Sequence, residues 1–284
     1  MNRKQFLANT FVLGVGSFFK KFVPSFMIQS ALQVQHIRNA TLTITYNGVT
    51  LLVDPLLSKK NMLDPIPWTN NIRNPLVDLP FDDSQLQRII DKADAVLLTH
   101  LHLDHWDSVA QQRIPRSITI VCQEEDVNTL QEQGFHKLLD NKTNNVKDVF
   151  QIERVPAKHG HGELAAKMAP VSGYIIKAGG YTIYLAGDSV WYEGIKHTIE
   201  QYRPDIIIVN AGAAQFQFGE PITMTAEDVA QVIQTAPETS KVIAVHMEAI
   251  NHCYLKRIEL KEKLSTWKLE ARCLIPADGE TMNF

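Results

Sequence analysis

The sequence of 284 residues has few cysteines, no long apolar run and almost no excess charge of either sign. Its three cysteines, Cys122, Cys253 and Cys273, lack the spacing of a metal motif and cannot all pair with one another, which excludes a disulfide scaffold. No stretch reaches the roughly 18 consecutive apolar residues that a membrane span needs. With 28 basic and 31 acidic residues the net charge is −3, so we expect no nucleic-acid binding driven by phosphate contacts.

Residues 1–30 form an N-terminal extension that we set apart from the fold. Arg3 and Lys4 precede an apolar stretch at 11–19, and two further lysines follow. This arrangement loosely resembles a twin-arginine export signal, although the pair is Arg-Lys and no small-residue cleavage site follows. Two interpretations stay open: export to the bacterial periplasm, or an amphipathic helix on a cytoplasmic protein.

Residues 31–284 are predicted to form one domain, because no linker rich in Pro, Gly or Ser divides them. Strands are expected at 34–37, 41–46, 49–53, 95–99, 118–122, 150–155, 173–178, 181–186, 206–210 and 242–245. Helices are expected at 84–92, 124–133, 193–201, 226–235 and 254–264, with Ser84 and Thr225 as N-caps. Strands and helices alternate in both halves, which suits two β-sheets packed face to face with helices outside. The proline-rich segment 55–83 reads as a long loop of the kind that often borders a binding site.

Three of the ten histidines fall within six positions, in the segment Thr99-His100-Leu101-His102-Leu103-Asp104-His105. The segment directly follows the apolar run at 95–99, which is typical of a strand covered on both faces. Side chains on a turn at the end of a buried strand are held in place by the sheet behind them. His100 and His102 can point at one metal ion, and Asp104 and His105 toward a second position. A solvated polar turn is the less favoured alternative.

The His-x-His-x-Asp-His pattern after an apolar strand resembles the metal motif of the metallo-β-lactamase superfamily of hydrolases. Four more segments resemble the other motifs of that superfamily in the right order. They are Val53-Asp54-Pro55, the strand ending at His159, Ala186-Gly187-Asp188-Ser189, and Ala244-Val245-His246. The resemblance runs from about residue 34 to the C-terminus, and it implies an α/β fold: a four-layer αββα sandwich of two facing mixed β-sheets flanked by helices.

The resemblance also implies a site with two divalent metal ions. Nitrogen and carboxylate ligands without thiolate suit Zn²⁺, Mn²⁺ or Fe²⁺ and do not choose among them; Zn²⁺ is the first expectation. The first ion is assigned to His100, His102 and His159, and the second to Asp104, His105 and His246, with Asp188 bridging. Asp54 is expected to support the metal loop from behind. His161 is the alternative to His159, since the two flank Gly160.

The implied activity is that of a hydrolase that uses a metal-bound hydroxide on a small ester, lactone or phosphodiester. Two cations about 3.5–4 Å apart lower the pKa of a shared water towards 7, and Asp104 is expected to orient this nucleophile and accept its proton. Many β-lactamases of this fold have cysteine where this chain has Asp188, so hydrolysis of β-lactam antibiotics is a less favoured activity. The closest branch is that of ascorbate-6-phosphate lactonase and the N-acyl-ethanolamine phospholipase D-like enzymes. The alternatives are an iron-dependent oxidoreductase on the same fold and a catalytically silent metal-binding protein.

Other polar and aromatic residues are candidates for roles outside this set. Trp68, Trp191 and Tyr192 are candidates for lining the substrate pocket. His252 is a candidate hydrogen-bond donor to an oxyanion, and Asp278 either supports a ligating histidine or is a turn residue. His36, His136 and His197 are interpreted as structural or exposed, and the three cysteines as packed thiols rather than ligands. The expected partner is a small molecule, and the sequence does not determine the oligomeric state.

Overall fold

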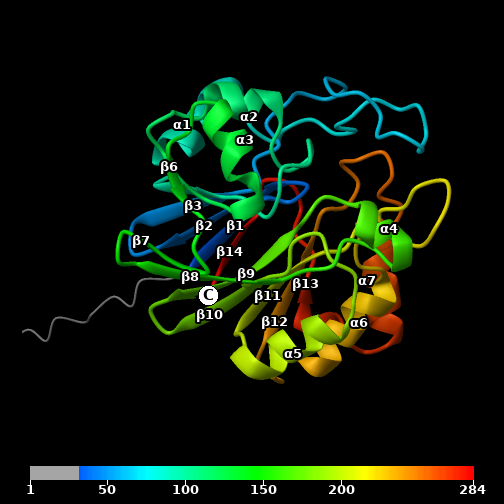
Figure 1. Cartoon of the computed structure of the whole chain (residues 1–284). Coiled ribbons are helices and arrows are strands. Elements are labelled where there is room, and N and C mark those ends of the chain that lie inside the picture. The colour runs from blue at the N-terminus through cyan, green and yellow to red at the C-terminus, as the bar shows by residue number, and fades with distance from the viewer. Residues whose placement is uncertain (1–31) are drawn as a thin grey trace, which may run out of the picture.

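The computed structural model describes residues 32–284, which form two seven-stranded β-sheets facing each other. Figure 1 shows the sheets between two groups of helices. The predicted division at residue 30 and the predicted export signal lie outside the described residues and stay predictions. Within residues 32–284, no helix is long and apolar enough to cross a membrane.

The first sheet has the strand order β14-β1-β2-β3-β4-β5-β6. Its strands are β1 (Gln33–Arg38), β2 (Thr41–Tyr46), β3 (Val49–Val53), β4 (Ala95–Leu97), β5 (Thr119–Val121), β6 (Lys137–Leu139) and β14 (Thr281–Asn283). The hairpin of β2 and β3 turns at Asn47 and Gly48, both with positive φ, as the Asn-Gly signal predicts. From β3 to β6 the strands run parallel, so their carboxyl ends meet at one edge.

The second sheet has the order β13-β12-β11-β10-β9-β8-β7. Its strands are β7 (Thr143–Val146), β8 (Phe150–Pro156), β9 (Ser172–Ala178), β10 (Tyr181–Leu185), β11 (Ile206–Asn210), β12 (Lys241–Val245) and β13 (Cys273–Leu274). Strands β10 to β13 are parallel, whereas β7 to β10 are antiparallel. Each sheet is therefore mixed, as predicted.

Three apolar layers hold the sandwich together. The central layer joins the inner faces of the sheets, for example Leu51 and Val53 with Ile176 and Ile208. A second layer lies between the first sheet and α1 (Asp83–Lys92), α2 (Ser108–Arg113) and α3 (Val127–Glu132). A third lies between the second sheet and α5 (Glu193–Tyr202), α6 (Ala226–Thr235) and α7 (Arg257–Thr266). This confirms the predicted αββα fold.

Several helix boundaries differ from the predictions. The N-cap of α1 is Asp82 rather than Ser84, because the Asp82 carboxylate accepts a hydrogen bond from the Gln85 backbone in a capping box. The helix predicted at 124–133 is divided into the 3₁₀ turn η1 (Glu124–Asp126) and α3. Helix α7 begins at Arg257, because the Leu255 backbone N–H is bound to the Gly212 carbonyl. The short elements α2, α4 (Gly162–Lys167), η2 (Glu270–Arg272), β6, β7, β13 and β14 were not predicted.

Candidate metal centre

The predicted ligands follow the carboxyl ends of four strands, at one edge of the sandwich. His100 follows β4, His159 follows β8, Asp188 follows β10 and His246 follows β12. Strands β8, β10 and β12 point the same way, because β8 and β10 both pair antiparallel with β9, and β10 to β12 are parallel. The sheets therefore bring together side chains that are up to 146 positions apart in the chain, the separation of His100 and His246.

The first ligand group consists of His100, His102 and His159, whose potential ligand atoms all lie within 4.8 Å of one another. His100 Nε2 is 2.9 Å from His102 Nδ1. His159 Nε2 is 3.5 Å from Asp188 Oδ2. His161, the alternative considered for the third ligand, instead occupies the N-cap position of α4 and belongs to neither group.

The second ligand group consists of Asp104, His105, Asp188 and His246, again within 4.8 Å of one another. His246 Nε2 lies 3.1 Å from Asp104 Oδ2 and 3.2 Å from His105 Nε2. Asp188 stands between the two groups, since its Oδ2 is 3.3 Å from His105 Nε2 and 3.9 Å from His100 Nε2. A carboxylate in this position can contact two cations at once.

The outward-facing nitrogens show that the donor set fits a metal. His159 Nδ1 donates to the Ile222 carbonyl at 2.8 Å, and His105 Nδ1 donates to Asp54 Oδ2 at 2.9 Å. His246 Nδ1 is 3.5 Å from Cys253 Sγ. Metal-binding histidines almost always have the second ring nitrogen held in this way, which fixes the tautomer and the ring orientation. All seven side chains are buried or half-buried, and they offer only nitrogen and oxygen, which suits Zn²⁺, Mn²⁺ or Fe²⁺.

Asp54 holds the metal loop from behind, as the sequence predicts. Its Oδ1 accepts the Thr99 backbone N–H at 2.8 Å, and its Oδ2 accepts from Thr99 Oγ1 at 2.7 Å as well as from His105. The carboxylate is almost completely buried. It therefore fixes both the end of β4 and the imidazole of one ligand.

The backbone is strained where ligands leave the strands. Gly187 has a φ of +64°, and a Cβ there would lie 2.6 Å from the Ser172 carbonyl oxygen, so only glycine fits before Asp188. His246 and Glu248 also have positive φ, at 63° and 64°. Non-glycine residues in this conformation cluster at functional sites, where the surrounding structure maintains it. Arg257 holds this turn by donating to Glu248 Oε2 at 2.6 Å.

The two ligand groups differ in charge. Burial lowers the pKa of His100, His102 and His159, so that these imidazoles are neutral and have a free lone pair. Burial also opposes protonation of His105, but Asp188, Asp104 and Asp54 outweigh it and raise the pKa to about 10. Burial also opposes protonation of His246, but Asp188, Cys253 and Asp104 outweigh it and hold its pKa well above its usual value. The second group carries both ligand carboxylates and therefore attracts positive charge.

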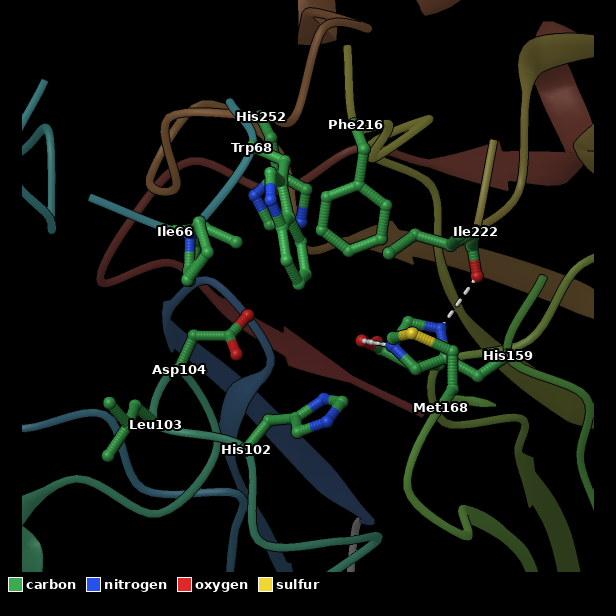
Figure 2. Close-up of a pocket in the computed structure, with 12 residues that line it drawn as sticks. Ile66, Trp68, His102, Leu103, Asp104, His159, Met168, Phe216, Ile222 and His252 are labelled. Carbon is green, nitrogen blue, oxygen red and sulfur yellow. Dashed lines mark hydrogen bonds and ion pairs between the residues drawn. The ribbon is translucent and has the colours of Figure 1, made fainter. Parts of the chain in front are cut away.

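A cavity of about 260 Å³ opens beside the cluster. Figure 2 shows Asp104, His102 and His159 on one side of it, and Trp68, Phe216 and His252 on the other. The remaining lining residues are Ile66, Pro67, Leu103, Met168, Asp188 and Ile222. No lysine or arginine is among these residues of the described chain. The cavity thus combines an apolar, aromatic wall with the polar edge of the metal cluster.

The structure places some of the other candidate residues at the cavity and the rest away from it. Trp68 lines the cavity, whereas Trp191 and Tyr192 pack against the apolar layer under α5 to α7. Asp278 forms an ion pair with Arg257 and touches no ligating histidine, so its suggested support of a ligand is wrong. His36 is buried and its Nε2 is 3.0 Å from the Asn39 carbonyl, which confirms a structural role.

Sequence reasoning missed several residues that shape the site. Asn39 joins two ligand segments: its side-chain amide donates to the Asp104 carbonyl at 3.1 Å, and its carbonyl accepts the His246 N–H at 2.9 Å. Phe216, Ile222 and Met168 line the cavity from segments without a strong pattern. The aromatic alternation Gln215-Phe216-Gln217-Phe218 is a signal that could have indicated this wall.

Comparisons with known proteins agree with this geometry. A family model described as "Beta-lactamase superfamily domain" matches residues 50–247. The UPF0173 protein YddR of Bacillus subtilis is 36% identical over 258 residues, which cover 89% of this chain and 100% of the relative. The crystal structure of an isothiocyanate hydrolase from Delia radicum gut bacteria matches with a TM-score of 0.82 and 36% identity over 89% of this chain and 99% of that one. A possible metal-dependent hydrolase from Veillonella parvula matches with a TM-score of 0.84 and 30% identity, over 90% and 100%.

Proposed function

The chain belongs to the metallo-β-lactamase superfamily and, within it, to the UPF0173 metal-dependent hydrolases, and from this premise we propose that it uses two divalent cations, Zn²⁺ in the first place, to hydrolyse a small uncharged electrophile. The first candidate substrate is an organic isothiocyanate, because this chain is 36% identical to the isothiocyanate hydrolase and matches 99% of its length. The observation that carries the proposal is the apolar cavity that opens onto the ligand cluster.

The lining of the cavity favours substrates without charge. Ile66, Trp68, Phe216 and Met168 offer apolar and aromatic surface to a substrate tail. A phosphate or carboxylate on the tail would lose its hydration there without a cation to replace it, and this loss costs several kcal/mol or more. Uncharged lactones and esters remain compatible with the site. Phosphorylated lactones, which the branch resemblance implies, fit it less well because their phosphate would lie in the apolar part of the cavity. A phosphodiester would carry its charge at the cations instead, so it is the charged alternative that the substrate panel tests.

The cations, when bound, lower the pKa of a water molecule and polarise the electrophilic carbon. His100, His102 and His159 would hold one cation and His105, His246 and Asp104 the other, with Asp188 touching both. Asp104 has Oδ2 towards His246 and also lines the cavity, so its carboxylate is placed to orient the attacking water and accept a proton.

The addition of this water to an isothiocyanate, R–N=C=S, needs no further reactant, because the water supplies every atom that is added. The water oxygen forms a bond to the central carbon as the π pair of the C=N bond moves to nitrogen. The proton accepted by Asp104 is then returned to that nitrogen, which leaves the thiocarbamic acid R–NH–C(=S)–OH. The apolar wall holds the R group so that the carbon faces the water.

The test is a substrate panel with protein loaded with Zn²⁺, Mn²⁺ or Fe²⁺ and its metal content measured by mass spectrometry. We expect two ions per chain and hydrolysis of benzyl isothiocyanate that chelation abolishes. An uncharged lactone and 4-nitrophenyl acetate form a second arm, and bis(4-nitrophenyl) phosphate a third. Faster turnover of the phosphodiester would contradict the assignment of an uncharged substrate. Oxygen consumption by the iron form would support the oxidoreductase alternative, and inactivity of every metal form would support the silent one.

A further inference from the structure

His252 is the one histidine of the cavity wall that belongs to neither ligand group. The residue is only 5% exposed, and its side chain lies beside Trp68 and Phe216, across the cavity from His102 (Figure 2). The imidazole stacks on the Phe216 ring, with a centroid distance of 5.9 Å and an interplanar angle of 13°. The ring plane is therefore held by packing.

The backbone around His252 is fixed by hydrogen bonds on both sides. The His252 carbonyl accepts the Gln215 N–H at 3.0 Å. The preceding residue, Asn251, donates through its side-chain amide to Thr69 Oγ1 at 2.8 Å, and its backbone N–H donates to Asn74 Oδ1 at 2.8 Å. These bonds join the 248–253 turn to the proline-rich loop. The position of His252 is thus determined before any ligand enters.

The ring itself, in contrast, is not satisfied by the protein. Its Nδ1 is buried and has no hydrogen-bond partner among residues 32–284. Burial lowers the pKa of His252 to about 4, although Asp104 opposes the shift, so the ring is neutral at physiological pH. A neutral imidazole carries one N–H, and an N–H on the buried Nδ1 would have no acceptor. The proton therefore belongs on Nε2.

We propose that His252 is a catalytic residue that donates a hydrogen bond from Nε2 to the heteroatom of the substrate on which negative charge develops. In an isothiocyanate this atom is nitrogen or sulfur, and in an ester or lactone it is the carbonyl oxygen. The inference rests on the proposed function, because it requires an uncharged substrate in this cavity. A fixed, neutral donor stabilises such charge without giving up its proton, as an oxyanion-hole donor does.

The experiment compares the metal-loaded protein with His252→Phe, which keeps a ring against Phe216, and His252→Gln, which restores an N–H near the position of Nε2. The control is His197→Gln, on the exposed face of α5. We expect His252→Phe to lower kcat/KM for benzyl isothiocyanate about 100-fold, with two ions per chain retained. His252→Gln should recover about tenfold of this loss, and the control should match the unaltered protein.

A binding measurement separates this inference from the proposed function. N-Benzylacetamide carries the same aryl group and a carbonyl acceptor, and calorimetry should give a Kd about tenfold weaker for His252→Phe than for the unaltered protein. If the unaltered protein does not hydrolyse benzyl isothiocyanate, the proposed substrate is wrong, and the binding comparison still decides the role of His252. Equal affinities, absence of binding to the unaltered protein, or loss of metal from His252→Phe would overturn the inference.

Discussion

At the scale of single residues, the histidines of the cluster differ in the group that contacts Nδ1 of the ring. This group is a carboxylate for His105, a backbone carbonyl for His159, a hydroxyl for His100 and a thiol for His246. A carboxylate raises the basicity of its imidazole more than a neutral acceptor does. His105 is therefore the ligand whose metal affinity depends most on its support.

This gives a first prediction, for Asp54→Asn. The amide keeps the size of the side chain but loses the charge, and it cannot accept from Thr99 and His105 with both atoms. We expect metal affinity 10–100-fold lower, measured by competition with a chromogenic chelator. Asp205→Asn is the matched control, since Asp205 accepts a backbone N–H from Thr182 at 2.8 Å far from the site. Unchanged affinity in Asp54→Asn would show that the loop holds its shape without this charge.

The second prediction concerns Asp104→Asn. The variant keeps an oxygen for the cation but loses most of the basicity, so turnover should fall roughly 10²–10⁴-fold, the range typical of losing a general base. At least the ion at His100, His102 and His159 should stay bound. Turnover and metal content are measured together on the substrate that the panel identifies. Near-normal turnover with both ions bound would place the base elsewhere.

The control for this variant follows from the structure. His36→Ala, which is attractive from the sequence because His36 lies outside the cluster, is unsuitable. The ring is buried against the Asn39 carbonyl, and Asn39 in turn contacts Asp104 and His246. His136→Ala is a better control, because His136 is exposed and directly precedes β6. It should leave turnover within about twofold, as for most surface substitutions away from a site.

At the scale of elements, strands place the ligands and irregular segments supply the cavity wall. The proline-rich loop and the loop after β11 meet where the Gln217 N–H donates to the Trp68 carbonyl at 2.9 Å. Trp68 is 68% exposed and packs edge-on against Phe216 and Phe218. Two loops far apart in the chain thus form one aromatic wall, which neither could build alone.

The junction of η1 and α3 gives a prediction on pH. Asp126 has a buried Oδ2 with no partner among the described residues, and burial raises its pKa to about 6. Because the folded state binds this proton more tightly than the unfolded chain does, stability falls as pH rises from about 4 to 6, and the cost is complete above pH 6.

Replacing Asp126 with Asn should remove this cost. Allowing for solvent screening of the carboxylate, we expect the variant to be more stable than the unaltered protein by about 1 kcal/mol at pH 8 and equally stable at pH 4. Urea unfolding at the two pH values measures the difference. Glu124→Gln, at the exposed start of η1, should change stability by less than about 0.5 kcal/mol at either pH. A gain by Asp126→Asn at pH 4 as large as that at pH 8 would refute the explanation.

At the scale of the whole molecule, the cluster connects the two sheets at one edge. Asp104 and His105 come from the first sheet, and Asp188 and His246 from the second. Bound cations would therefore stabilise the contact between the two halves of the sandwich, because they bind the folded chain and not the separated ligands.

Metal removal should accordingly lower stability. With free Zn²⁺ at 1,000 times its Kd, each bound ion contributes about 4 kcal/mol, and one ion alone corresponds to a melting temperature about 10 °C higher than that of the chelated protein. Scanning calorimetry before and after chelation measures the shift. Added Zn²⁺ should restore it, whereas Mg²⁺, which prefers oxygen ligands, should not. Identical melting with and without Zn²⁺ would contradict a site that joins the two sheets.

The sequence by itself determined most of the strands and indicated the candidate donor set. Apolar runs such as Ile206–Asn210 match the observed strands, because a buried strand must be apolar on both faces. The His100–His105 segment indicated a metal because its donors are close along the chain. Shorter elements such as β6 and β13 escaped prediction, since two or three residues carry no readable period.

Only the tertiary structure decided which distant residues meet. It placed His159 rather than His161 in the cluster, and it brought Asn39 to Asp104 and His246. It also assembled the apolar wall beside the ligand cluster from segments that lie far apart in the chain. These contacts depend on how the two sheets pack and on where loops cross, and such long-range geometry leaves no local pattern in the order of the residues.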